Sequence, residues 1–134
     1  MRHIMIIVLF VLSLNATSIT MQSSYKTALK EAKKADRPLL IYLSMPHCKT
    51  CEYMNREVLN QTKIVSYLNK YYIVVHLDSD DHTLPRKLRA NVSPVFHFID
   101  PRTDEMIESI MGGRNASKFL KLLKYSYRDY RDGP

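Results

Sequence analysis

Residues 38–53 read PLLIYLSMPHCKTCEY, and this stretch decides the fold. It begins with an unbroken apolar run from Leu39 to Ser44, which has strand length and is typical of a strand covered on both faces. The tetrapeptide Cys48-Lys49-Thr50-Cys51 follows and holds both cysteines of the chain. A helical pattern then starts at about Thr50. Two thiols at the junction of a strand and a helix can cycle between dithiol and disulfide, so the stretch predicts redox chemistry on an α/β fold.

The position of the first cysteine predicts its reactivity. Unpaired backbone N–H groups at a helix start favour an anion, so we expect Cys48 to ionise below its free pKa and to attack disulfides of other proteins. Cys51 is near enough to resolve the mixed disulfide. A purely structural bridge is less favoured, because so small a ring constrains the unfolded chain by only about 2 kcal/mol. Small secreted domains that depend on disulfides also carry four or more cysteines.

The remaining pattern alternates helices and strands over one domain of ordinary size. A helix with Ser23 or Ser24 as its N-cap precedes the first strand. We then expect a helix over 50–69 with a bend near 60–62, a strand over 72–77, a short helix over 85–89, strands over 95–99 and 105–111, and a last helix capped by Asn115 or Ser117. Residues 125–134 are expected to fray. The order predicts a three-layer α/β fold with a central mixed four-stranded sheet, flanking helices and an extra N-terminal helix.

The N-terminus differs from the rest of the chain. Arg2 and His3 lead into an eleven-residue apolar stretch, Ile4–Leu14, and then into small polar residues. This pattern is typical of a secretory signal peptide with cleavage near Ala16 or Ser18, and an uncleaved anchor is the alternative. We therefore divide the chain into a leader over 1–18, a domain over 19–126 and a C-terminal tail over 127–134. The leader predicts a periplasmic protein, either released or anchored to the membrane.

The net charge of +7 comes from basic residues that are spread along the chain. At helical spacing they indicate solvated outer faces. For an exported domain without a basic motif interleaved with aromatic residues, we expect no nucleic-acid partner.

Three features together resemble the thioredoxin superfamily, over about Lys30 to Lys124. They are the CxxC at a strand-to-helix junction, Val92-Ser93-Pro94-Val95 about forty residues later, and Gly112-Gly113 before the last helix. The resemblance implies a thioredoxin fold, with Cys48 as the attacking thiolate and Cys51 as the more buried, resolving thiol. It also implies a cis Ser93–Pro94 bond, and backbone beside this proline that receives an extended substrate segment.

The chain differs from cytoplasmic thioredoxins within the CxxC motif and at Tyr42, in the strand before it. Those proteins carry Trp-Cys-Gly-Pro-Cys, whereas this chain has His47-Cys48-Lys49-Thr50-Cys51. A cation close to a thiolate lowers its pKa, so His47 and Lys49 are candidate modulators of Cys48. The buried acid of thioredoxin falls at Tyr42, so its proton relay is absent or rebuilt. Glu52 either substitutes for that acid or is an exposed carboxylate that suits the helix dipole.

The resemblance implies a monomeric, exported thiol–disulfide oxidoreductase. We expect no metal and no cofactor beyond the Cys48–Cys51 disulfide. Its partners would be cysteine-containing exported proteins such as apocytochromes, and a membrane electron donor would keep it reduced. A small domain of this plan favours a reductase, whereas a cation at Lys49 would favour a periplasmic oxidant or isomerase.

Two other functions compete with this interpretation. Soft ligands cluster around the motif, which favours a Cu(I) carrier; they are Met45, His47, Cys48, Cys51 and Met54. A thioredoxin-like interaction domain with little redox activity is the third interpretation. The three histidines outside the motif, His76, His82 and His97, are interpreted as structural.

Overall fold

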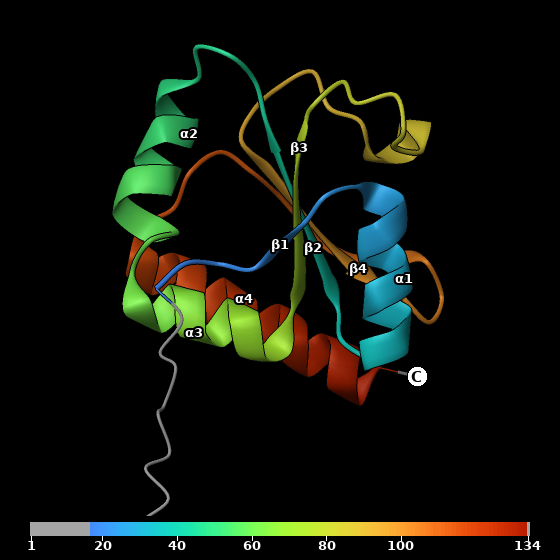
Figure 1. Ribbon diagram of the computed structural model, residues 1–134. Helices are drawn as coiled ribbons and strands as arrows, with labels where there is room; N and C mark the ends of the chain where they lie inside the picture. Colours follow the sequence, from blue (N-terminus) through green and yellow to red (C-terminus); the bar gives the residue numbers. More distant parts are fainter. Residues whose placement is uncertain (1–16, 134) are drawn as a thin grey trace, which may run out of the picture.

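A five-stranded sheet lies between two layers of helices in the computed structural model, which describes residues 17–133 (Figure 1). The strands run in the spatial order β1-β3-β2-β4-β5. Their bounds are Met21–Gln22 (β1), Leu39–Ser44 (β2), Ile73–Asp78 (β3), Val95–Asp100 (β4) and Glu105–Met111 (β5). The predicted leader lies almost entirely outside the described residues, which begin at residue 17.

Strand β2 is the centre of the sheet. It pairs in parallel with β3 and antiparallel with β4. Its first five residues are buried, and they alternate between two separate hydrophobic cores on the two faces of the sheet. Leu40 and Tyr42 enter one core, while Leu39, Ile41 and Leu43 enter the other. The apolar run is therefore a strand covered on both faces, as the sequence predicts.

Helix α1 (Tyr25–Ala35) covers one face of the sheet, and α2 (Lys49–Tyr53), α3 (Thr62–Tyr71) and α4 (Ala116–Asp132) cover the other (Figure 1). Ser24 is the N-cap of α1, because its hydroxyl accepts the N–H of Thr27. The short 3₁₀-helix η2, Arg86–Leu88, stands where the sequence predicts a short helix. No helix within residues 17–133 is long and apolar enough to cross a membrane.

The helix expected over 50–69, with a bend near 60–62, is interrupted there: its first part ends at Val58 and α3 begins at Thr62. Helix α2 continues directly into a π-helical turn, η1, over Met54–Val58. The N–H of Leu59 donates to the carbonyl of Met54, five residues earlier, and closes this wider turn. Helix α3 then starts afresh at Thr62.

The expected fraying of residues 125–134 is wrong, because α4 continues to Asp132. Tyr130, near its end, is only 4% exposed. Its hydroxyl donates to the carboxylate of Asp36, and the guanidinium of Arg102 lies over its ring, 4.2 Å from the centroid. These contacts come from distant parts of the chain and hold the last turns of the helix.

The sheet also has five strands rather than the four predicted. The additional strand is β1, in which Met21 and Gln22 pair in parallel with Val74 and Val75 at the edge of β3. The four expected strands form the rest of the sheet, so the three-layer α/β architecture is confirmed.

Candidate functional site

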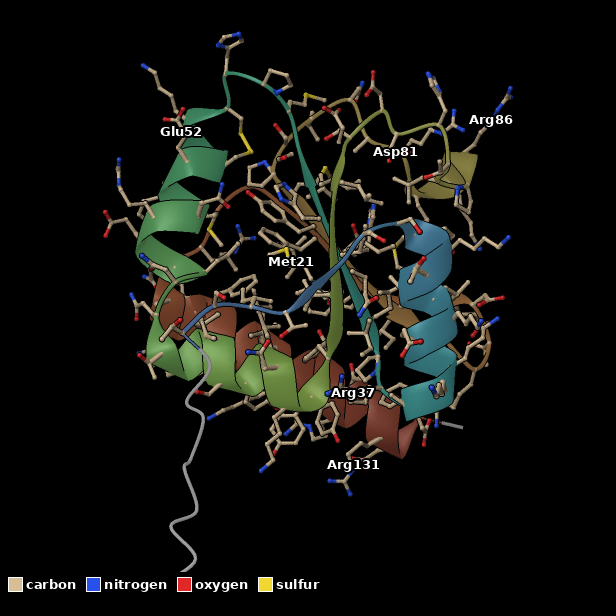
Figure 2. All side chains as sticks on the ribbon, viewed as in Figure 1. Met21, Arg37, Glu52, Asp81, Arg86 and Arg131 are labelled. Atoms are coloured by element: carbon tan, nitrogen blue, oxygen red, sulfur yellow. A yellow bond between two sulfur atoms is a disulfide. The ribbon has the colours of Figure 1, made fainter. Side chains whose placement is uncertain are left out.

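Cys48 and Cys51 form a disulfide at the start of α2, just beyond the carboxyl end of β2 (Figure 2). Cys51 is 4% exposed and faces the interior, whereas Cys48 is only half-buried. An incoming thiol or disulfide therefore reaches the sulfur of Cys48 more easily. Cys51 is thus the more buried of the two, as the resemblance implies.

The sulfur of Cys48 lies at the N-terminus of α2, where backbone N–H groups have no partner within the helix. Cys48 is the N-cap residue of α2, with extended backbone angles. The N–H of Cys51 donates to Cys48 Sγ at 3.1 Å, and the N–H of Glu52 donates to the Cys48 carbonyl at 3.1 Å. Because a thiolate accepts such a bond more strongly than a thiol, this N–H stabilises Cys48 as an anion when the pair is reduced.

The two cationic candidates beside Cys48 are both exposed to solvent. His47 and Lys49 lie on either side of it, and neither side chain is buried. Solvent screens charges at such positions, so they act on the sulfur more weakly than the adjacent backbone N–H does. His47 also has a positive φ of 58°, which is uncommon for a residue with a Cβ and marks the sharp turn into α2.

The segment that contains Pro94 emerges at the same end of the sheet as the cysteines. Leu43, near the end of β2, pairs with Val95, the first residue of β4. The Ser93–Pro94 peptide bond is cis, Pro94 is buried and Ser93 is half-buried. The Pro94 carbonyl accepts the N–H of Gly112 at 2.8 Å, which joins this segment to the turn before α4. The antiparallel pairing of β2 and β4 therefore places the Ser93–Pro94 segment beside the loop that leads to Cys48.

Tyr42 lies below the disulfide and is fully buried. Its ring stacks between His76 and Phe96, with centroid separations of 4.3 and 4.7 Å. Its hydroxyl donates to the Cys51 carbonyl at the long distance of 3.5 Å. Burial raises the pKa of Tyr42 to about 12, so the hydroxyl keeps its proton at neutral pH. Tyr42 is therefore not a proton acceptor in the way that a buried carboxylate would be.

Glu52 does not rebuild that carboxylate either. It is exposed in the first turn of α2, and Figure 2 shows it on the outer side of the helix. An exposed carboxylate at this position suits the positive end of the helix dipole, which is the second of the two interpretations that the sequence allows.

Met54 and Gly113 pack the turn before α4 against α2. Met54 is fully buried, and its Sδ accepts the N–H of Arg114 at 3.4 Å. A Cβ on Gly113 would lie 2.8 Å from Cγ2 of Thr50, a residue between the two cysteines. Only a glycine allows so close an approach without a local shift.

The soft ligands named for copper do not all face one site. Met54 is buried in the core, while His47 is exposed to solvent. Within residues 17–133 no three His, Cys, Asp or Glu side chains gather in a way that could hold a metal ion. His97 is buried with both ring nitrogens engaged, one by the Ser109 hydroxyl and the other by the Leu88 carbonyl, which is a structural role.

An open groove of about 550 Å³ runs beside the site. It lies between the loop that leads to Cys48 and the segment that leads to Pro94, and is lined by Met45, Pro46, Asp78, Asp80, Ala90 and Asn91. Below it lies Ser79, a fully buried serine that sequence reasoning missed. A single serine in the polar turn after β3 carries no local signal of importance.

A disulfide at a strand-to-helix junction, with a proline just before β4 at the same end of the sheet, is typical of thioredoxin-fold proteins with a CxxC pair. The model of the thioredoxin-like domain matches residues 25–127, and the chain belongs to this family. A search of curated proteins finds no match.

Solved structures share this fold at low sequence identity. A thioredoxin from Thermus thermophilus has a TM-score of 0.72 and 24% identity, over 86% of this chain and 91% of its own. DsbH oxidoreductase has a TM-score of 0.67 and 16% identity, over 87% and 89% of the two chains. The oxidised C-terminal domain of DsbD from Neisseria meningitidis has a TM-score of 0.63 and 16% identity, over 81% and 99%.

Proposed function

We propose that this protein is an exported thiol–disulfide oxidoreductase that reduces disulfides of other proteins through Cys48 and Cys51. The observation that carries the proposal is the position of Cys48 Sγ, half-buried at a helix start, where it accepts the Cys51 N–H at 3.1 Å. This position favours the thiolate, and the thiolate is the form that attacks a disulfide.

The reaction has two exchange steps. The Cys48 thiolate attacks one sulfur of the substrate disulfide, a mixed disulfide forms, and the other substrate sulfur leaves as a thiolate. Cys51 then loses its proton and attacks Cys48 Sγ, so that the second substrate thiolate leaves and the Cys48–Cys51 disulfide forms. Two electrons pass to the substrate, whose thiolates take up two protons. Tyr42 keeps its own proton at neutral pH, so it does not accept the proton of Cys51, and we propose solvent as the acceptor.

The segment around Ser93 and Pro94 would hold the substrate backbone during these steps. It lies at the end of the sheet where the Cys48 loop also emerges, so an extended peptide can run beside it with its cysteine near Cys48. His47 and Lys49 would add a weak, solvent-screened attraction for the thiolate. We expect no metal and no further cofactor in this reaction.

The proposal also covers where the protein acts, which partners supply and accept its electrons, and in which direction it exchanges disulfides. The apolar stretch over residues 4–14 of the predicted leader supports export, either to the periplasm or to its membrane surface. A reductase in an oxidising compartment needs electrons from a membrane donor, and apocytochromes with paired cysteines are suitable acceptors. We propose that the domain acts as a monomer. If the couple is oxidising instead, the same site would make it a disulfide oxidant or isomerase.

The test is reduction of insulin disulfides, followed by turbidity with dithiothreitol as the electron donor. We expect activity in the wild-type domain, loss of activity in Cys48→Ser, and trapped mixed disulfides in Cys51→Ser. Retained reduction by Cys48→Ser would contradict the proposal. The equilibrium reduction potential of the pair then settles the direction: a value near about −270 mV marks a reductant, and one near about −120 mV marks an oxidant.

A further inference from the structure

Ser79, the residue after β3, joins the two loops of the site through all of its polar groups. It is fully buried. Its N–H and its hydroxyl both donate to the Ser44 carbonyl, at 2.9 and 3.1 Å. The hydroxyl also lies 3.4 Å from the Val92 carbonyl, and the Ser79 carbonyl accepts the N–H of Ala90 at 3.1 Å.

The partners of Ser79 belong to the two segments that carry the chemistry. Ser44 ends β2 and is four residues before Cys48. Ala90 and Val92 lie in the segment that enters β4 through Pro94. The backbone of Ser79 joins the two segments through its N–H and its carbonyl. Its hydroxyl adds a second connection, because its one hydrogen is shared between the Ser44 carbonyl of the first segment and the Val92 carbonyl of the second.

We propose that Ser79 is a positioning residue for the exchange reaction, which holds the loop leading to Cys48 and the segment leading to Pro94 at a fixed separation. This inference rests on the proposed function. An extended substrate must lie beside Pro94 while its sulfur reaches Cys48, so the separation of the two segments determines how well a protein disulfide fits. A small disulfide touches only Cys48 and does not depend on that separation.

The test compares Ser79→Ala with wild type on two substrates. One is insulin, and the other is hydroxyethyl disulfide, which has no peptide segment. The variant keeps the backbone bonds of residue 79 and loses only the hydroxyl. We expect kcat/KM for insulin to fall about fivefold, the factor that corresponds to one hydrogen bond, while the rate with hydroxyethyl disulfide stays at the wild-type value.

Ser126→Ala is the matched control, because Ser126 is also fully buried but its hydroxyl has no hydrogen-bond partner within residues 17–133. It lies in α4, away from the cysteines, and we expect both rates to stay at the wild-type value. Ser79→Thr keeps the hydroxyl and adds a methyl group. We expect the ratio of its two rates to match the wild-type ratio, even if the methyl group lowers its stability.

The outcomes separate this inference from the function on which it rests. If the wild-type domain exchanges with neither substrate, the proposed function fails. If it is active and Ser79→Ala loses both rates in equal proportion, or loses neither, the positioning role is refuted. The positioning role is also refuted if Ser79→Thr has the same ratio of insulin to hydroxyethyl disulfide rates as Ser79→Ala, because the effect would then not depend on the hydroxyl.

Discussion

Gly113 gives a direct test of how closely the turn before α4 packs against the cysteine pair. A Cβ at this position would lie 2.8 Å from Thr50 Cγ2 and 3.5 Å from Met54 Sδ. The first distance is about 1 Å shorter than an ordinary contact between carbon atoms, whereas the second is close to ordinary. The clash in Gly113→Ala therefore falls almost entirely on one methyl group.

Two effects of opposite sign determine the stability of Gly113→Ala. Forcing Thr50 away from its preferred rotamer costs about 0.5–1.5 kcal/mol, and shifting the turn instead costs about 1–3 kcal/mol. Because Gly113 does not have a positive φ, alanine also restricts the unfolded chain and returns about 0.4–1 kcal/mol. We expect the variant to be about 1 kcal/mol less stable than wild type.

Thr50→Ser isolates the steric part, because it removes Cγ2 and keeps the hydroxyl. In that background only the favourable effect on the unfolded chain remains, so Gly113→Ala should stabilise the domain by about 0.5 kcal/mol. The coupling between the two sites is then about 1–2 kcal/mol, measured by urea unfolding of the four oxidised proteins. Gly112→Ala is the matched control: its φ of +83° strains alanine by about 1–2 kcal/mol whatever residue 50 is, so it should show no coupling. Equal destabilisation by Gly113→Ala in both backgrounds would refute the close approach.

Three further predictions concern stability. Burial lowers the pKa of His97, and its bond to a backbone carbonyl only partly opposes this. As the pH drops, the unfolded chain therefore binds a proton at His97 before the folded chain does. The contribution of His97 to stability is complete above a pH of about 6.5 and is lost as the pH falls toward the folded pKa. The free energy of unfolding, measured in urea between about pH 7 and 5, should fall less steeply in His97→Gln than in wild type, and an equal fall in both would contradict this. Asn115→Ala should lower the free energy of unfolding by about 1 kcal/mol through loss of the α4 N-cap, while Ser117→Ala should leave it unchanged. Tyr130→Phe removes the hydroxyl bond to the residue after α1 and should cost about 1 kcal/mol, against no change for the exposed Tyr125→Phe; equal values for the two would show that the end of α4 is not held by this bond.

The sequence predicts the parts of the fold that depend on local patterns. The bounds expected for the strand over 105–111 are those of β5, and the apolar run from Leu39 to Ser44 is β2. Each of these segments is set by its own alternation or apolar run and by a turn beside it. Ser24 and Asn115 are caps for the same reason, since a capping side chain acts on backbone N–H groups only three residues away.

The errors fall where structure depends on contacts between distant residues. The polar, aromatic end of the chain resembles a tail, but Tyr130 contacts Asp36, the residue after α1, and Arg102, in the turn between β4 and β5. Asp36 is 94 positions away from it. Strand β1 has two residues, too few for any periodicity, and forms only because the edge of β3 is open to it. Ser79 is missed because its importance comes from Ser44 and Val92, which the fold alone brings together.

The role of Tyr42, below the disulfide, follows only from the family resemblance and the structure taken together. The resemblance identifies Tyr42 as the residue in place of a buried acid, but it does not decide whether another group restores the proton relay. The structure answers for the residues nearest the pair: the tyrosine keeps its proton, its ring is held between His76 and Phe96, and Glu52 faces solvent. A neutral aromatic stack below Cys51 places no negative charge beside its sulfur, unlike a carboxylate, which would oppose the thiolate in the second exchange step. The backbone N–H that contacts a sulfur of this site is that of Cys51, and it acts on the sulfur of Cys48 rather than on that of Cys51.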